Sequence, residues 1–111
     1  MNILLFTSAM MDNHFASYQN NAKIKPNPSN QNFYSKLIRS LALRNNVNVV
    51  SHRPFAKGMF KEHSLPEETG TQLNIQYFYS KSQCKKIYKI FNEKSDIVKT
   101  AHKAIEEFHS N

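Results

Sequence analysis

At 111 residues the chain has room for one small domain with a modest buried core. Hydrophobic residues make up 40% of it and charged residues 21%, which is typical of a globular protein, and two glycines with four prolines exclude a fibrous or low-complexity chain. The net charge of +7 bears on what the protein associates with rather than on its fold.

The first predicted element is a strand over residues 2–9. Its apolar side chains form a continuous run rather than an alternating one, as in a parallel strand that is covered on both faces. The stretch that follows, residues 10–28, shows no periodicity, is rich in asparagine and contains two prolines. We therefore expect a long loop there, of the kind that is functional or mobile.

A helix is predicted over residues 30–44, because the apolar residues recur at helical spacing as Phe33, Leu37, Ile38, Leu41 and Ala42. Residues 47–52 form the second predicted strand. Two strands joined by a helix are most naturally parallel and connected by a right-handed crossover. The first half of the chain therefore predicts a strand–helix–strand unit.

Residues 54–71 contain two prolines and two glycines and predict an irregular excursion before a third strand over residues 73–79. The last predicted element is a long helix over residues 83–109, with a break near Ser95. We expect one domain over residues 1–111, a three-layer, Rossmann-like α/β fold with a mostly parallel sheet. Because no fourth strand follows the last helix, the pattern is that of a truncated domain.

Signatures of catalysis are missing from the sequence. Two glycines cannot form a glycine-rich phosphate loop, and the five histidines lack the spacing of a zinc site. No nucleophile elbow occurs either. The residues alone therefore identify no catalytic group, although a Ser-His-Asp triad stays open, and they predict no metal site and no bound cofactor.

Polar side chains gather where the first strand leads into the first helix. Ligands bind at the carboxyl ends of the strands in open α/β sheets, and helix N-termini offer free N–H groups to oxyanions. At this edge Arg53 is either a bidentate donor to a phosphate or carboxylate or an ordinary surface arginine. Four amides are placed either to hydrogen-bond sugar hydroxyls or to cap a surface loop: Asn27, Asn30, Gln31 and Asn32.

Family resemblance is carried by the strand over residues 1–9, by the lysine-containing loop after it, by segment 26–38 (PNPSNQNFYSKLI) and by segment 51–60 (SHRPFAKGMF). Together they resemble the start of bacterial GT-B-fold glycosyltransferases of capsule and cell-surface polysaccharide synthesis. The resemblance extends over essentially the whole chain, but a two-domain member is about three times longer. The chain is therefore expected to be the N-terminal fragment of such an enzyme.

The resemblance implies an acceptor-binding domain that transfers no sugar without its donor domain. In the family the C-terminal domain binds the nucleotide-sugar donor, and the catalytic histidine follows a later strand that is missing here. The first loop also lacks the Gly-Gly pair that often contacts the donor. No catalytic residue is therefore carried over. The substrate-binding residues that the resemblance implies lie at the edge facing the interdomain cleft: Thr7, Ser8, Met10, Asn30, Gln31, Asn32 and Arg53.

Positive charge is concentrated in two regions of the chain. Residues 1–61 hold eight Lys or Arg against Asp12 alone, and residues 81–103 hold seven lysines against two acidic residues. The lysines of the last predicted helix form either a solvated face or a contact with an anionic membrane, which would suit a lipid-linked acceptor. They are Lys81, Lys85, Lys86, Lys89, Lys99 and Lys103.

Expected partners are thus a sugar or lipid-linked acceptor, the missing donor domain, an anionic membrane surface and a second copy bound through an exposed apolar edge. Nucleic acid is disfavoured, because the aromatic residues fall on core positions. The single cysteine, Cys84, cannot form an internal disulfide, and no apolar run suits a membrane-spanning helix or a signal peptide. We therefore predict a cytoplasmic protein that is in peripheral contact with the plasma membrane. The alternative is a complete small basic α/β module that binds RNA or an acidic partner.

Overall fold

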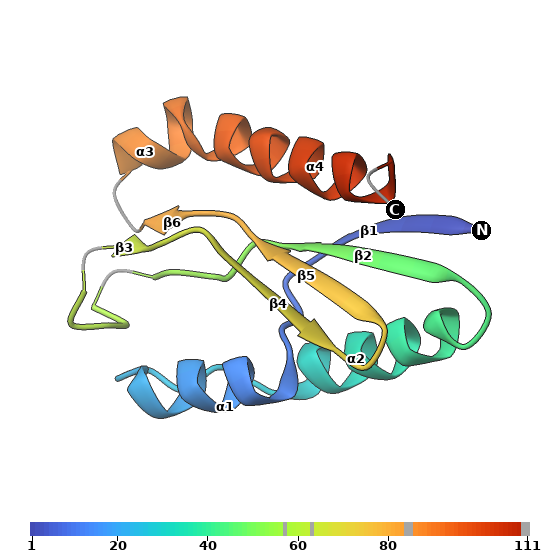
Figure 1. The fold of residues 1–111 in the computed structure, drawn as a ribbon. Coiled ribbons are helices and arrows are strands. Elements are labelled where there is room, and N and C mark those ends of the chain that lie inside the picture. The colour runs from blue at the N-terminus through green and yellow to red at the C-terminus, as the bar shows by residue number, and fades with distance from the viewer. Residues whose placement is uncertain (57, 63, 84–85, 110–111) are drawn as a thin grey trace.

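The computed structural model describes residues 1–56, 58–62, 64–83 and 86–109 of the chain. Its strands are β1 (Asn2–Thr7), β2 (Asn46–Ser51), β3 (Ser64–Leu65), β4 (Glu68–Gln72), β5 (Ile75–Tyr79) and β6 (Ser82–Gln83). The central sheet has the order β1–β2–β5–β4 (Figure 1). In it β1, β2 and β5 are parallel and β4 is antiparallel to β5, while β3 and β6 form a separate antiparallel pair. The mixed, mostly parallel sheet confirms the prediction.

Helices cover both faces of the central sheet. They are α1 (Asp12–Asn21), α2 (Ser29–Ala42), α3 (Lys86–Phe91) and α4 (Glu93–His109). Figure 1 shows α1 and α2 on one face of the sheet and α3 and α4 on the other. This arrangement confirms the predicted three-layer α/β architecture. Among the described helices, none combines the length and the apolar character that crossing a membrane requires.

The core is divided by the central strand β2 into a larger and a smaller part. Val47 and Val49 are at most 1% exposed and belong to the larger cluster, which also contains residues of α1 and α2. Val50 faces the opposite way and packs with Ala104 of α4. On the same face Asn48 is buried and donates from its amide to the Ala104 carbonyl at 2.8 Å. Coverage on both faces explains why residues 47–51 of this strand are all buried, Asn48 and Ser51 included.

Three predicted elements differ at their ends from what the structure contains. The first strand, expected over residues 2–9, ends at Thr7 as β1 because the Thr7 hydroxyl accepts the Ala9 N–H at 3.1 Å and turns the chain. The first predicted helix, expected over residues 30–44, is α2 and lies one residue earlier at its start and two at its end. Predicted strand 47–52 is β2, which begins and ends one residue earlier.

The long helix predicted over residues 83–109 is interrupted at Asn92, between α3 and α4, rather than near Ser95. The Asn92 N–H still bonds to the Tyr88 carbonyl and the Asp96 N–H to the Asn92 carbonyl, so the chain stays close to helical across the break. Residues 84–85, including Cys84, lie outside the described part of the chain.

The prediction of a long loop over residues 10–28 is wrong, because α1 lies within it. Met11, Phe15, Tyr18 and Ala22 recur every three or four residues and pack into the larger core. The asparagines and serine between them are weak helix formers, so local propensity hides this pattern. Packing against the sheet is what stabilises α1.

The hairpin formed by β4 and β5 was not predicted. The third predicted strand, expected over residues 73–79, is β5, which begins two residues later than predicted, at Ile75. Leu73 and Asn74 form the tight turn of this hairpin, and Leu73 has φ 57°, a left-handed conformation that favours glycine or asparagine. The turn therefore lacks the usual hairpin residues. β4 itself contains Gly70 and no large apolar residue, which is why the irregular excursion was predicted there instead.

Candidate ligand-binding site

A cavity of about 320 Å³ lies where the carboxyl ends of β2 and β5 meet α1. We call it the carboxyl-edge cavity. Open α/β sheets bind their ligands at this edge, so it is the candidate site. The described residues that line it are Met10, His14, Ser17, Tyr18, Asn21, Arg53, Phe60, Glu62, Ser64, Leu65, Pro66, Glu68 and Tyr79.

Helix α1 reaches the cavity because Gly70 lets it lie close against β4. A Cβ at Gly70 would meet Met11 Sδ and would lie 2.9 Å from His14 Cε1. The Tyr79 hydroxyl holds the same end of the helix, since it accepts the Met11 N–H at 2.9 Å and is hydrogen-bonded to His14 Nδ1 at 2.8 Å. The sheet thus sets the position of His14 in the cavity wall.

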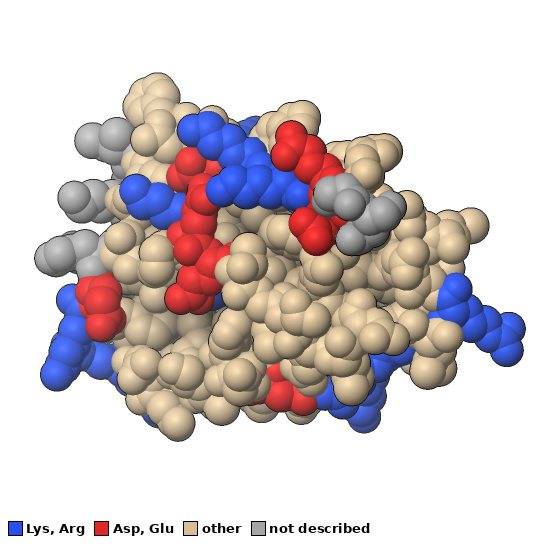
Figure 2. Space-filling model, viewed as in Figure 1, with Lys and Arg blue, Asp and Glu red and all other residues tan. Residues whose placement is uncertain are grey.

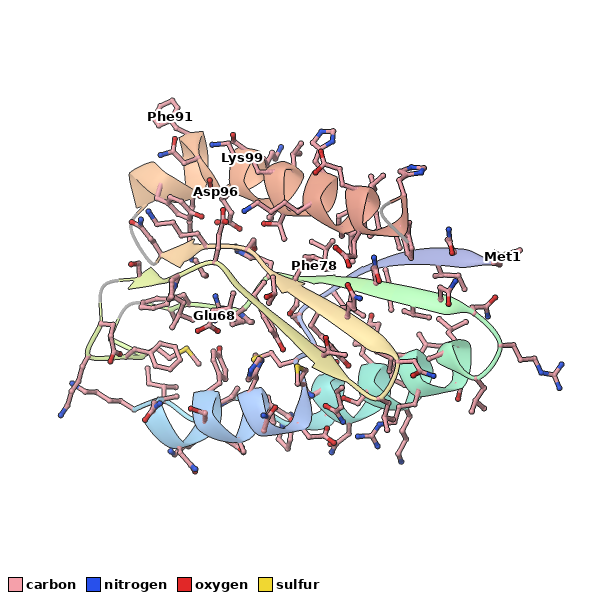
Figure 3. The ribbon with its side chains drawn as sticks, in the orientation of Figure 1. Met1, Glu68, Phe78, Phe91, Asp96 and Lys99 are labelled. Atoms are coloured by element: carbon pink, nitrogen blue, oxygen red, sulfur yellow. The ribbon has the colours of Figure 1, made fainter. Side chains whose placement is uncertain are left out.

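Arg53 is buried at the floor of the cavity, only 6% exposed. Its Nη1 donates to Glu68 Oε2 at 2.9 Å, and its Nη2 donates to the carbonyls of Pro66 and Ser80. The guanidinium also lies over the Tyr79 ring, 5.1 Å from the centroid. Burial lowers the pKa of Arg53, and the Glu68 carboxylate opposes this effect. Figure 3 shows Glu68 between the sheet and α1.

Aromatic side chains form the apolar wall of the cavity. The rings of Tyr18 and Phe60 have centroids 5.1 Å apart, and Phe60 contacts Phe55 at the same separation. The Tyr18 hydroxyl donates to the Pro54 carbonyl at 2.5 Å, and burial raises the pKa of Tyr18 to about 12. Burial also raises the pKa of Tyr79. Both phenols therefore act as neutral hydroxyl groups near neutral pH.

The cavity is acidic although the chain is basic. Arg53 is neutralised by Glu68, and Glu62 adds a second carboxylate to the lining. With the net charge of the whole chain at +7, this site disfavours anions locally while the rest of the surface attracts them. The lining can hydrogen-bond hydroxyl groups through carboxylates, an amide, two serines and an imidazole, and its rings can contact an apolar face. Among the described residues no group of three His, Cys, Asp or Glu is placed to hold a metal ion.

The structure brings Met10 and Arg53, two of the predicted binding residues, into the cavity lining. Arg53 is not a free surface donor, because its partner carboxylate comes from the same chain. Gln31 is buried beside the cavity and binds the backbone of Met10, with Nε2 donating to the Met10 carbonyl at 2.7 Å and Oε1 accepting the Met10 N–H at 2.8 Å. This amide holds the chain after β1 in place.

Four other predicted binding residues are not part of the described lining. Thr7 and Ser8 are half-buried at the end of β1, and Asn30 and Asn32 are exposed on α2. Asn27 Oδ1 accepts the N–H of Ser29 at 2.9 Å in the turn before α2, whose N-cap position is occupied by Pro28 without a side-chain cap. Ligand binding by Thr7, Ser8, Asn30 and Asn32 remains a prediction.

His14, Tyr18, Glu68 and Tyr79 were missed as site residues by the sequence reasoning. The helical spacing of Met11 and Tyr18 would have placed α1, and with it His14, at the carboxyl edge. Nothing in the sequence indicates Glu68, because its approach to Arg53 depends on an antiparallel hairpin without a hairpin signature.

A second polar cluster lies on the opposite face, around His52. His52 Nδ1 and the Ser80 hydroxyl are 2.6 Å apart, and His52 Nε2 lies 3.2 Å from Glu93 Oε1. Ser80 is fully buried, so it is inaccessible to a substrate. Burial lowers the pKa of His52, Glu93 opposes this effect, and the charges of Arg53 and Lys89 add to it. The cluster ties the end of β2 to the start of α4.

This lowered pKa predicts a loss of stability in mild acid. As pH falls below the ordinary value of 6.5, His52 of the unfolded chain takes up a proton before His52 of the folded chain does. The free energy of unfolding should therefore fall from about pH 6.5 downward until the folded-state pKa is passed. Thermal unfolding of wild type and of His52→Gln between about pH 7.5 and 5 measures this. A parallel decline of the two proteins would contradict the assignment.

The lysine face predicted for the last helix is interrupted by acidic side chains. Lys89, Lys94 and Lys99 are exposed, whereas Lys103 is paired with Glu67 at 2.6 Å. Figure 2 shows red side chains among the blue ones over this part of the surface. Lys85 and the side chain of Lys86 lie outside the described part. Membrane contact through this face remains a prediction.

No protein-family model, no curated protein and no solved structure matches the chain. The function therefore has to be argued from the fold and from the carboxyl-edge cavity.

Proposed function

We propose that this chain is the acceptor-binding part of a GT-B-type glycosyltransferase of cell-surface polysaccharide synthesis. The observation that carries the proposal is the position of the cavity, at the carboxyl ends of parallel strands in a three-layer α/β fold. In this role the cavity holds part of a sugar or lipid-linked acceptor on the cytoplasmic side of the membrane. The nucleotide-sugar donor binds to a separate donor domain, so the chain alone transfers no sugar.

The chemistry of the lining supports a hydroxyl-rich ligand. Carbohydrate sites combine hydrogen-bonding side chains with aromatic rings that contact the apolar face of the sugar. Glu62, Asn21 and Ser17 supply hydrogen-bonding groups here, and Tyr18 with Phe60 supplies the rings. A cavity of about 320 Å³ is at the lower end of the range for small-molecule sites and would accommodate about one or two sugar units.

The charge of the lining favours the sugar part of the acceptor over a phosphate. An anion in the cavity would meet Glu62 and Glu68, while Arg53 is already paired. A phosphate of a lipid-linked acceptor is therefore expected to lie outside the cavity, toward the basic surface. Neutral glycosides should bind more tightly than their phosphates.

Binding of methyl glycosides of glucose, galactose and N-acetylglucosamine tests the proposal, with glucose 1-phosphate for comparison. We expect dissociation constants on the order of 1 mM for a cavity that holds only part of an acceptor, and weaker binding of the phosphate. Ser17→Trp should abolish binding by filling the cavity from α1. The matched control is Ala16→Trp, because Ala16 is exposed on α1 and is not among the described lining residues.

Two results would contradict the proposal. One is turnover of a nucleotide-sugar by the isolated chain, which would show that no donor domain is needed. The other is failure of every glycoside to bind together with RNA binding that weakens steeply with added salt, which would identify a basic nucleic-acid-binding module.

A further inference from the structure

The hydrogen bonds of the Tyr79 hydroxyl determine which nitrogen of His14 carries the proton. The hydroxyl accepts the Met11 N–H at 2.9 Å, and its oxygen lies 2.8 Å from His14 Nδ1. Burial raises the pKa of Tyr79, so the phenol keeps its proton near neutral pH. Tyr79 is 1% exposed, and among the described residues its hydroxyl has no hydrogen-bond partner besides Met11 and His14.

It follows that Tyr79 donates this hydrogen bond and His14 Nδ1 accepts it. A buried hydroxyl whose proton had no acceptor would lose the hydrogen bond that water gives it in the unfolded chain, whereas donation to Nδ1 satisfies both groups. A neutral imidazole has one N–H, and when Nδ1 is an acceptor that proton lies on Nε2. The hydrogen-bond network therefore assigns the Nε2–H tautomer to His14.

The His14 ring is also held in place at the cavity wall. Its Cε1 lies 2.9 Å from where a Cβ at Gly70 would be, and its ring centroid is 5.0 Å from that of Tyr79. His14 lines the carboxyl-edge cavity, and in the part of the chain that the structure describes no residue is hydrogen-bonded to Nε2. The Nε2–H group is thus a donor of fixed position that is available to a ligand.

The other polar groups of the described lining differ from this donor. Glu62 and Glu68 can only accept when ionised, whereas the serine hydroxyls and the Asn21 amide can either donate or accept. Arg53 uses Nη1 and Nη2 for Glu68 and two backbone carbonyls, and its Nε is buried. The lining therefore combines a fixed donor, His14, with carboxylates that are fixed acceptors.

We propose that Tyr79 is a positioning residue and that the Nε2–H of His14 selects a free hydroxyl group on the sugar; this inference rests on the proposed function. A hydroxyl can accept from Nε2–H and donate to a carboxylate of the lining at the same time. An ether oxygen cannot donate, and an ammonium group cannot accept. The same tautomer excludes His14 as a general base through Nε2, because that nitrogen already carries the proton. The ligand class is a glycoside with an unsubstituted hydroxyl at this place.

Nitrogen NMR of the imidazole groups tests the tautomer on the chain without any ligand. At about pH 8, where histidines are neutral, His14 should show a protonated Nε2 and an unprotonated Nδ1. His102 is the internal control, because it is exposed on α4 and should show a mixture of both tautomers. Tyr79→Phe should move His14 toward such a mixture. Tyr77→Phe, which removes a neighbouring buried phenol on the same face of β5, should leave His14 unchanged.

Glycoside affinities test the selection of a hydroxyl. A methyl glycoside and its analogues that lack one hydroxyl at a time are titrated against the wild type and His14→Leu. One analogue should bind the wild type about fivefold more weakly than its parent, which is the loss expected of one neutral hydrogen bond. The same analogue should bind His14→Leu as tightly as the parent does. His14→Gln keeps an N–H donor and should retain the preference for the hydroxyl.

Three results would overturn the inference. One is a proton on Nδ1 of His14 in the wild type, or a mixture of tautomers like that of His102. Another is a set of analogues that lose the same affinity in the wild type and in His14→Leu. The third is failure of every glycoside to bind, which would overturn the proposed function as well. The tautomer of the free chain distinguishes this last case, because its measurement needs no ligand.

Discussion

Replacing Arg53 by alanine is expected to lower the free energy of unfolding by about 3 kcal/mol, because it removes a buried guanidinium together with its hydrogen bonds. The side chain is 6% exposed and bonds to Glu68 and to the carbonyls of Pro66 and Ser80. Its removal leaves those acceptors without their donor and takes away the contact with the Tyr79 ring. For a domain of this size the melting temperature should fall by about 12 °C.

Arg39→Ala is the matched control for this loss. Arg39 also forms an ion pair with a carboxylate, but the side chains of Arg39 and Asp12 are 45% and 59% exposed. Exposed pairs contribute little, so a change within about 0.5 kcal/mol is expected. Both variants can be measured by urea or thermal unfolding. Equal losses from the two substitutions would show that Arg53 is not part of the buried network described above.

Replacing Gln31 by alanine should cost about 3 kcal/mol in the free energy of unfolding, because it leaves two buried polar groups without partners. These groups are the N–H and the carbonyl of Met10, a residue only 2% exposed. The loss should also loosen the chain between β1 and α1, and therefore the wall of the cavity. Chemical unfolding gives the stability, and glycoside affinity of the variant gives the effect on the cavity.

Asn32→Ala serves as the control for this substitution. Asn32 is a neighbouring amide on α2 but is exposed, and a change within about 0.5 kcal/mol is expected. If Gln31 instead acts only as a ligand-binding amide, Gln31→Ala would keep wild-type stability and lose glycoside affinity alone. That outcome would contradict the structural role described here.

Elements with strong apolar periodicity were predictable from the sequence. The apolar spacing of α2 and the valine-rich segment of β2 identified both elements to within two residues at each end. These patterns are local, and the crossover rule then gives the parallel pairing of β1 with β2. The three-layer architecture follows from such elements.

Contacts between distant segments were not predictable in the same way. β4 contains no large apolar residue and owes its place to a turn at Leu73, where a left-handed leucine replaces the usual glycine or asparagine. Helix α1 consists largely of weak helix formers and is held by the larger core and by Tyr79. Local propensity carries no information about such tertiary stabilisation.

In the candidate site, too, local patterns were predictable from the sequence and contacts between distant segments were not. Position along the fold placed Met10 and Arg53 at the carboxyl edge, and both residues line the cavity there. The partner of Arg53 comes from β4 and the imidazole of His14 from α1, and neither element was predicted from the sequence. The roles of individual side chains in the cavity were therefore not predictable, because they depend on helices and strands that local sequence patterns do not indicate.

The central claim is that the carboxyl-edge cavity binds the sugar of an acceptor, and mapping the binding site of a methyl glycoside by NMR tests it most directly. In a titration of the ¹⁵N-labelled chain, the account predicts saturable shifts of the amides of Ser17, Tyr18, Asn21 and Glu68, with those of Lys99 and Lys103 on α4 unchanged. Absence of shifts at the cavity for every glycoside, or shifts confined to α4, would contradict it.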